Sequence, residues 1–317
     1  MKFHYWIFRR LLKYSSPLTK VFESILYKKN SSAEPKNIPI FIVGAPRSGS
    51  TILYQLITNI FNVSYIDNLV SMSKENFLIG FWLSNKLYKS QPHNSYKSKH
   101  GSTIKGGLHA PAEGGGIWKT WIPVHNEYLY TDIINKKQAE KIKNNINAVI
   151  NKYNKPFIIK NNYNSLRIRI IKEIFPNAKI IFIKREPLSV AQSIIKAREN
   201  IYGDRESWWS VKPPNYDEIK NMYYPQQVIK QIYFIEKKIV EDLKKFNKNR
   251  VLIINYTALS NLHECINNFK FFLGDINIRD NVKLEKIKIN RKEYLEPEII
   301  SILKAEIEKY DWENYSS

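Results

Sequence analysis

The chain of 317 residues has very little cysteine: Cys265 is the single one. One cysteine cannot form an intramolecular disulfide, and it offers no cluster of thiolates to a metal ion. We therefore expect Cys265 to be a small buried residue of an apolar helix, and we expect no metal site. Long apolar runs are also lacking, since no stretch approaches the roughly 20 residues that cross a bilayer. The N-terminus has no signal-peptide core.

Acidic residues are few: 29 Asp and Glu stand against 50 Lys and Arg, which gives a formal net charge of +21. Such an excess attracts anionic nucleotides, anionic acceptors or an anionic membrane, although part of it is simply solvated lysine. No nucleic-acid-binding module is recognisable, so we expect no nucleic acid partner. Residues 1–35 form a basic, amphipathic N-terminal segment. It is suited to a membrane interface or to packing on the domain.

Residues 40–51 combine a β-branched run with a tight glycine-containing loop, Ile-Phe-Ile-Val-Gly-Ala-Pro-Arg-Ser-Gly-Ser-Thr. Apolar residues recur at helical spacing after it, which predicts a strand, a loop and a helix in succession. Such a turn directs backbone N–H groups and a helix N-terminus at one phosphate. The spacing Gly44-x-x-x-x-Gly49-Ser50-Thr51 is that of a P-loop in which Ser50 replaces the usual lysine. Arg47 supplies a positive charge from within the loop.

Residues 178–193 read as a strand, a basic turn and a second helix. Pro187 falls in the first helical turn, where a missing N–H has no cost. Arg185 follows the strand and Ser193 lies about two turns into the helix. Both side chains can therefore face one anion beside the glycine-containing loop.

Together these two segments resemble sulfotransferases that use 3′-phosphoadenosine 5′-phosphosulfate (PAPS), over about residues 38–259, and bacterial carbohydrate sulfotransferases in particular. The resemblance implies two anion subsites. The 5′-phosphosulfate is expected on the loop, at Arg47, Ser48, Gly49, Ser50 and Thr51. The 3′-phosphate is expected at Arg185 and Ser193. In some members a basic loop closes over the 3′-phosphate, a place that residues 290–292 occupy here.

Four apolar runs have the length and composition of buried parallel strands, at 39–43, 157–160, 180–183 and 251–254. Helical patterns accompany them at about 136–152, 165–175, 187–198, 225–246, 262–273 and 297–310. Strands that alternate with helices form βαβ units. We therefore predict an α/β fold in residues 36–317, with a P-loop-like parallel sheet flanked by helices on both faces. Ligands bind such sheets beyond the carboxyl ends of the strands, where both motifs fall.

Lys160 directly follows a buried strand, in Phe-Ile-Ile-Lys-Asn-Asn at 157–162. Related sulfotransferases carry a Lys-Asn/Asp-Pro segment at this place, and its lysine contacts the transferring group. The resemblance therefore implies a catalytic role for Lys160, although Asn162 stands where proline is usual.

The base that accepts the acceptor proton is expected in the glycine-rich segment 106–118, which contains His109 and Glu113. The segment resembles the Pro-x-Glu-x-x-x-x-Trp pattern of bacterial carbohydrate sulfotransferases, which favours Glu113. His109 is the alternative base, because sulfotransferases use either residue type. An ion pair between Glu113 and a neighbouring lysine is the structural alternative.

The resemblance implies transfer of a sulfuryl group from PAPS to a hydroxyl, without a metal. The pairs Trp118/Trp121 and Trp208/Trp209 offer flat faces for a sugar ring, so we predict a carbohydrate acceptor such as a cell-envelope glycan or glycolipid. Core packing is the alternative role of these tryptophans, and a phenol or tyrosine the alternative acceptor. A P-loop kinase and a non-catalytic, membrane-associated protein of the same fold stay open. Because Golgi sulfotransferases have a membrane anchor, we expect a bacterial enzyme in the cytoplasm or at the inner face of the membrane.

Overall fold

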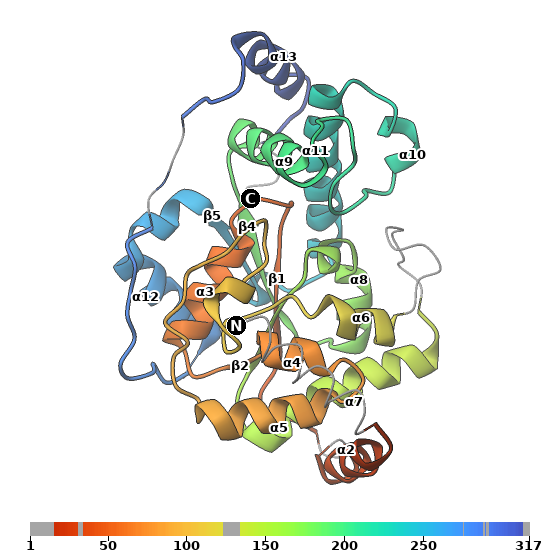
Figure 1. Cartoon of the computed structure of the whole chain (residues 1–317), viewed down its shortest axis with the longest axis vertical. Helices are drawn as coiled ribbons and strands as arrows, with labels where there is room; N and C mark the ends of the chain where they lie inside the picture. The colour runs from red at the N-terminus through yellow and green to blue at the C-terminus, as the bar shows by residue number, and fades with distance from the viewer. Residues whose placement is uncertain are drawn as a thin grey trace.

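The computed structural model describes residues 16–30, 34–122, 134–274, 276–287, 289 and 292–312. Five parallel strands form one sheet in the order β2-β3-β1-β4-β5 (Figure 1). They are β1 (Pro39–Val43), β2 (Ser64–Tyr65), β3 (Phe157–Lys160), β4 (Lys179–Lys184) and β5 (Val251–Asn255). The predicted parallel sheet is confirmed, and each predicted strand lies within one residue of its expected bounds. The two-residue β2 is too short to give a sequence pattern.

The helices cover the predicted positions and add several shorter elements. They are α2 (Ser16–Asn30), α3 (Ser50–Ile60), α4 (Asn68–Ser73), α5 (Phe77–Tyr88), α6 (Gly115–Trp121), α7 (Lys136–Tyr153), α8 (Ile168–Ile174), α9 (Pro187–Tyr202), α10 (Tyr216–Ile219), α11 (Tyr224–Leu243), α12 (Leu262–Leu273) and α13 (Pro297–Ile307). At the start of α9, Pro187 occupies the first turn as predicted, and the Glu186 carboxylate accepts the N–H groups of Leu188 and Ser189.

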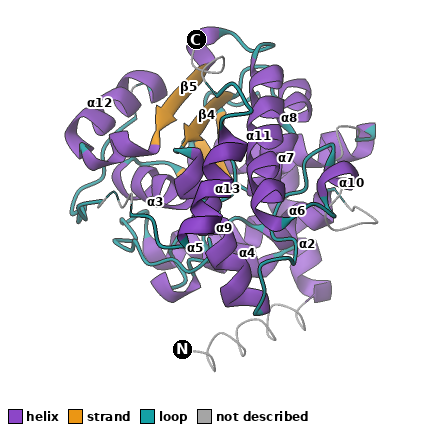
Figure 2. Ribbon diagram, turned by 90° about the horizontal axis from the view of Figure 1, so that it is seen from above, coloured by secondary structure: helices purple, strands orange, loops and turns teal. Residues whose placement is uncertain are grey.

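Alternate residues of the strands face opposite sides of the sheet, and each side has its own apolar core. Phe41, Phe157 and Phe182 pack with α7, α8, α9 and α11. Ile42 and Ile181 pack with α3 and α12 on the other side. Figure 2 shows the strands between these two groups of helices. The predicted helical layer on both faces of the sheet is therefore confirmed. Cys265 on α12 is 2% exposed, which confirms its predicted burial.

Of the basic N-terminal segment, the structure describes residues 16–30, 34 and 35; the prediction for residues 1–15 and 31–33 falls outside the described residues. Helix α2 packs against α5 and α7. The Glu23 carboxylate on α2 accepts the N–H groups of Leu78 (2.7 Å) and Ile79 (2.9 Å) in the first turn of α5. Among the described residues, no helix has the length and apolar character that crossing a membrane demands.

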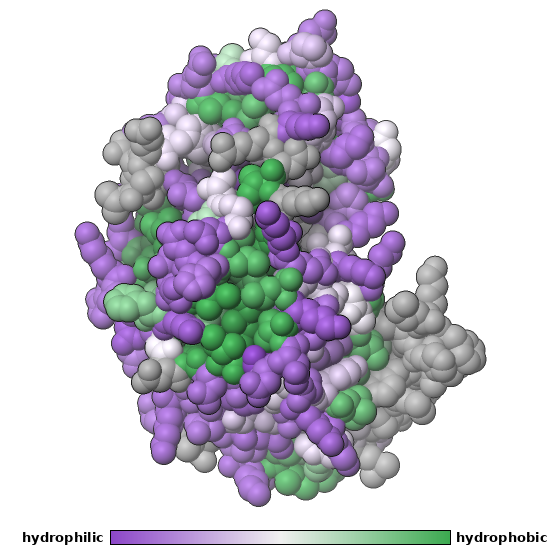
Figure 3. Space-filling model, turned by 90° about the vertical axis from the view of Figure 1, so that its left-hand side faces the viewer, coloured by the Kyte–Doolittle hydropathy of each residue, from purple (hydrophilic) through white to green (hydrophobic). Residues whose placement is uncertain are grey.

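One side of the molecule carries an area of apolar side chains with hydrophilic residues around it (Figure 3). This is the side on which Figure 1 shows α12 and the segment that follows it. These elements expose Phe271, Ile278 and Leu284 to solvent. Exposed apolar surface of this kind is suited to contact with another molecule or with lipid.

Candidate active site

The loop after β1 has two residues in the left-handed conformation, Arg47 (φ 68°) and Gly49 (φ 99°). At Gly49 a side chain is excluded twice, because a Cβ would also lie 2.3 Å from the Tyr256 ring. The start of the loop is fixed by Ser165, whose hydroxyl accepts the Gly44 N–H (3.0 Å) and donates to the Gly44 carbonyl (2.9 Å). Ser165 and Tyr256, which are distant in the sequence, thus fix the loop in front of the N-terminus of α3.

Arg47, Arg185 and Ser193 meet beside this loop, as predicted from the sequence. Arg47 donates from Nε to the Ser193 hydroxyl (2.8 Å), and Arg185 donates from Nη1 to the Arg47 carbonyl (3.2 Å). The Arg185 guanidinium also lies over the Tyr256 ring, 4.6 Å from its centre. Burial, and then the charge of Arg185, lower the pKa of Arg47.

This part of the site fits an anion. Within the described part of the chain, neither Arg47 nor Arg185 forms an ion pair with an acidic residue. The Ser48 hydroxyl in the same loop is fully buried and has no hydrogen-bond partner in the part of the chain that the structure describes. Two uncompensated arginines and an unpartnered hydroxyl beside a helix N-terminus match the charge and the donors that a phosphate or sulfate group needs.

Lys160 and Glu113, which come from separate predictions, form an ion pair. The Lys160 side chain is 2% exposed at the end of β3, and its Nζ also donates to the Thr51 hydroxyl (3.3 Å). The Glu113 side chain is 27% exposed, and its Oε2 accepts the Asn162 N–H (3.3 Å). Asn161 donates from Nδ2 to the Glu113 carbonyl (3.1 Å). The carboxylate is therefore held at the end of β3, directly beside the loop.

Two cavities meet at this ion pair. The first, here the loop cavity, has a volume of about 170 Å³ and is lined by Arg47, Gly49, Ser50, Thr51, Lys160 and Arg185, among others. The second, here the outer cavity, has a volume of about 360 Å³ and is lined by Asn68, Ser71, Thr103, Glu113, Tyr163 and Ser210, among others. His100, Gly101, Asn162 and Trp209 line both. A group bound in the loop cavity would therefore lie next to a second molecule in the outer cavity.

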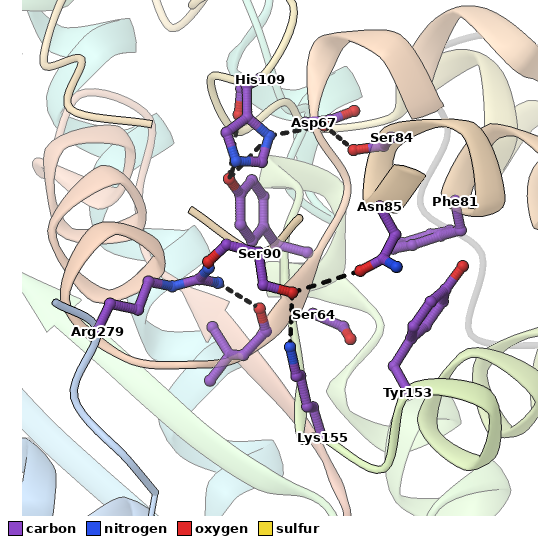
Figure 4. A pocket seen from close by; sticks show the side chains of 12 residues that line it. Ser64, Asp67, Phe81, Ser84, Asn85, Ser90, His109, Tyr153, Lys155 and Arg279 are labelled. Atoms are coloured by element: carbon purple, nitrogen blue, oxygen red, sulfur yellow. Dashed lines mark hydrogen bonds and ion pairs between the residues drawn. The ribbon is translucent and has the colours of Figure 1, made fainter. Parts of the chain in front are cut away.

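His109, the alternative base, faces a different cavity (Figure 4). Its Nδ1 lies 3.2 Å from the Asp67 carboxylate and its Nε2 lies 2.8 Å from the Gln91 carbonyl. The ring stacks on Tyr88 at 4.2 Å. These contacts turn the imidazole toward Lys155 and Arg279, which line the same cavity. His109 lines neither the loop cavity nor the outer cavity.

The aromatic faces predicted for an acceptor are only partly available. The prediction for Trp118 and Trp121 is wrong, because they are 5% and 2% exposed and pack in the core with Phe77. Trp208 packs edge-on against Tyr216 (4.7 Å). Trp209, in contrast, lines both the loop cavity and the outer cavity.

Two site residues give little signal in the sequence. Ser165 fixes the loop from 121 positions away, and His100 lies between the two cavities. The neighbouring Lys99 and Gly101 mark a turn, but nothing in the sequence relates that turn to the loop. Of the proposed basic closing loop at 290–292, Asn290 and Arg291 lie outside the described residues.

Comparison with known proteins indicates the same family as the sequence motifs. A model of the sulfotransferase family matches residues 39–264. The ω-hydroxy-β-dihydromenaquinone-9 sulfotransferases Stf3 of Mycobacterium bovis and Mycobacterium tuberculosis are each 27% identical to this chain over 185 residues, 52% of this chain and 46% of theirs. The matched part spans about half the length of these curated relatives.

Two sulfotransferases are among the solved structures to which this chain is similar. The match with STF9 from Mycobacterium avium has a TM-score of 0.48 and 12% identity. It covers 87% of this chain and 69% of the STF9 chain. The match with a sulfotransferase from Alicyclobacillus acidocaldarius has a TM-score of 0.43 and 16% identity. It covers 90% of this chain and 100% of that sulfotransferase chain. The family match itself spans well over half of the chain and includes the loop, Glu113, Lys160 and Arg185. The chain belongs to the sulfotransferase family.

Proposed function

We propose that this chain transfers the sulfuryl group of PAPS to a hydroxyl of a carbohydrate. The observation that carries the proposal is the junction of the two cavities. On one side lie Arg47 and Arg185, which have no acidic partner among the described residues. On the other side lies the Glu113 carboxylate, with Lys160 between them. A donor anion and an acceptor hydroxyl are thereby expected on opposite sides of one ion pair.

The loop cavity supplies the donors that PAPS requires. The backbone N–H groups at the start of α3 and the Arg47 guanidinium would hold the 5′-phosphosulfate. Arg185 and Ser193 would hold the 3′-phosphate. The Ser193 hydroxyl already accepts from Arg47, so its own O–H is available to donate to a phosphate oxygen. PAPS supplies a sulfuryl group bonded to a phosphate oxygen, which is the leaving group.

Glu113 and Lys160 are suited to the transfer itself. The acceptor oxygen bonds to sulfur while the bond from sulfur to the phosphate oxygen breaks, and the acceptor proton passes to Glu113. Lys160 donates hydrogen bonds to the sulfuryl and bridging oxygens, where negative charge increases. As in phosphoryl transfer, positioning and electrostatic stabilisation supply most of the rate.

The outer cavity favours a polyhydroxylated acceptor. Its lining is rich in amides and hydroxyls, with Asn68, Ser71, Thr103 and Ser210 among them, and Trp209 adds a flat apolar face. Sugar rings are bound by this combination of an aromatic face and several hydrogen-bonding groups. The curated relatives act on a hydroxylated menaquinone, as their name states, so the hydroxyl of a prenyl lipid is the second candidate acceptor.

A position at the inner face of an anionic membrane is part of the proposal. The net charge of +21 and the exposed apolar residues on the side of α12 support it. Glycolipids and prenyl lipids are both present at such a surface.

Incubation with labelled PAPS and parallel panels of envelope glycans, hydroxylated prenyl lipids, phenols and tyrosine peptides tests the proposal. We expect transfer to glycans, and its loss in Lys160→Ala. Transfer to the prenyl lipids alone would replace the carbohydrate by the second candidate. No transfer to any class, with ATP-dependent phosphorylation instead, would contradict the sulfotransferase activity.

A further inference from the structure

His100 occupies the tip of a tight turn in which Lys99 and Ser102 exchange backbone hydrogen bonds of 2.8 and 2.9 Å. Its backbone is left-handed (φ 49°), a conformation that a residue with a side chain rarely adopts. The turn places the imidazole where it lines both the loop cavity and the outer cavity. Its Nδ1 is buried and has no hydrogen-bond partner among the residues that the structure describes. Strain together with an unpartnered polar atom at a cavity junction indicates a functional role.

The charges around His100 are predominantly positive. Burial, and then the charges of Arg47 and Lys99, lower the pKa of His100. Lys160 and Arg185 line the same loop cavity, as does the phenol Tyr256. Glu113 faces the turn from the outer cavity: a Cβ added to Gly101 would lie 3.5 Å from its Oε1. Tyr163 lines that cavity as well. Without a bound anion, these surroundings therefore favour the neutral form of the imidazole.

We propose that His100 contacts the bound donor in its protonated form, so that donor binding takes up one proton at this imidazole. This inference rests on the proposed function, because it requires a dianionic ligand in the loop cavity. The ligand's negative charge offsets Arg47 and Lys99, and the imidazolium can donate a hydrogen bond to its oxygens. His100 thereby adds a pH-dependent contact to the permanent charges of the arginines.

The direction of the pH dependence follows from the two protonation states. In the free protein the pKa of His100 is lowered, and in the complex the ligand's charge raises it. Between these two pKa values, binding and protonation are coupled, so the affinity increases as the pH falls, by up to about tenfold per pH unit for one proton. Below the pKa of the free protein this increase stops.

Isothermal titration calorimetry with adenosine 3′,5′-bisphosphate measures the coupling directly. Titrations at one pH in buffers of different ionisation enthalpy give the number of protons taken up, and the series is repeated between pH 5.5 and 8. The phosphates of the ligand titrate in the same range, so the difference between variants is the signal. His100→Asn is the variant of choice, because asparagine tolerates the left-handed backbone and does not titrate. His263→Asn is the matched control, since His263 is an exposed residue of α12.

We expect the wild-type protein and His263→Asn to take up roughly half a proton or more beyond His100→Asn near pH 6.5. Their affinity should increase with falling pH more steeply than that of His100→Asn. Equal proton uptake in all three proteins would overturn the inference and leave the donor site intact. Absence of bisphosphate binding at every pH would overturn the inference together with the proposed function.

Discussion

Replacing Glu113 by glutamine should slow sulfuryl transfer and at the same time strengthen the binding of PAPS. The ion pair between Glu113 and Lys160 connects the two cavities, and the donor must compete with the carboxylate for the lysine. Glutamine has nearly the same shape, and its single carbonyl oxygen can still accept from Lys160, whereas an amide NH2 replaces the oxygen that accepts the Asn162 N–H. It cannot, however, accept a proton from the acceptor or hold the lysine with a full negative charge.

The two effects have different sizes. A positioned base contributes about 10²–10⁴-fold to a rate, so we expect kcat to fall by that factor. A hydrogen bond between charged groups contributes about 1.5–3 kcal/mol, which is roughly 10–100-fold in affinity. The Lys160 side chain is 2% exposed but that of Glu113 is 27% exposed, so water screens part of this interaction. We therefore expect the lower end, about tenfold tighter binding of PAPS.

Calorimetry with PAPS in the absence of acceptor gives the affinity, and a radiolabel transfer assay gives kcat. Glu173→Gln is the control, because Glu173 forms only an exposed pair with Arg169 (3.4 Å) and should change neither quantity. A Glu113→Gln variant that binds PAPS more weakly while transferring at the normal rate would refute the reasoning. In that case Glu113 would serve to orient Lys160, and another group would accept the proton.

Three further predictions concern the loop, the second arginine and the core. Gly49→Ala should abolish PAPS binding and lower Tm, because the added Cβ would lie 2.3 Å from the Tyr256 ring. Adding Tyr256→Ala should restore part of the lost Tm. A double variant with no recovery of Tm would contradict this steric cause. Arg185→Ala should weaken adenosine 3′,5′-bisphosphate roughly 10–100-fold and leave AMP nearly unchanged in calorimetry, whereas equal losses would remove Arg185 from the 3′-phosphate. Burial raises the pKa of Glu236 from 4.5 to about 7, so ionisation destabilises the folded state progressively between these values. Glu236→Gln should therefore raise Tm at pH 8 and change it little at pH 4.5, and the same Tm change at both values would argue against this titration.

Much of the fold could be predicted because its signals are local. Buried parallel strands are short continuous apolar runs, and β1, β3, β4 and β5 each have this pattern. The loop and the segment around Arg185 were predicted together because both follow strands of one parallel sheet, whose carboxyl ends lie at the same edge. Lys160 is at that edge for the same reason. Its distance from Arg47 along the chain therefore did not prevent the prediction.

The sequence does not predict the direction of side chains that depend on distant partners. His109 and Glu113 are only four residues apart, yet the ring is held by Asp67, Tyr88 and Gln91 and faces another cavity. Trp118 and Glu113 belong to one segment, but Trp118 lies in helix α6, whose buried face packs into the core. The type of a residue and its neighbours in the sequence give no information about such distant partners. The sequence does not indicate a role for His100, because that role depends on the residues of distant segments that line the loop cavity and the outer cavity with it.

The contact between Lys160 and Glu113 also bears on the order of events in the site. Lys160 lines the loop cavity and Glu113 lines the outer cavity, so each partner is exposed to a different ligand. While the lysine holds the carboxylate, Oε1 of Glu113 accepts from Lys160 rather than from an acceptor hydroxyl. When a sulfuryl oxygen takes over hydrogen bonds of Lys160, this carboxylate oxygen becomes available to the acceptor hydroxyl while the donor is in place. The acceptor hydroxyl then has a negatively charged partner that the unliganded protein offers only in paired form. Donor and acceptor should therefore bind cooperatively, and the cooperativity should disappear in Glu113→Gln.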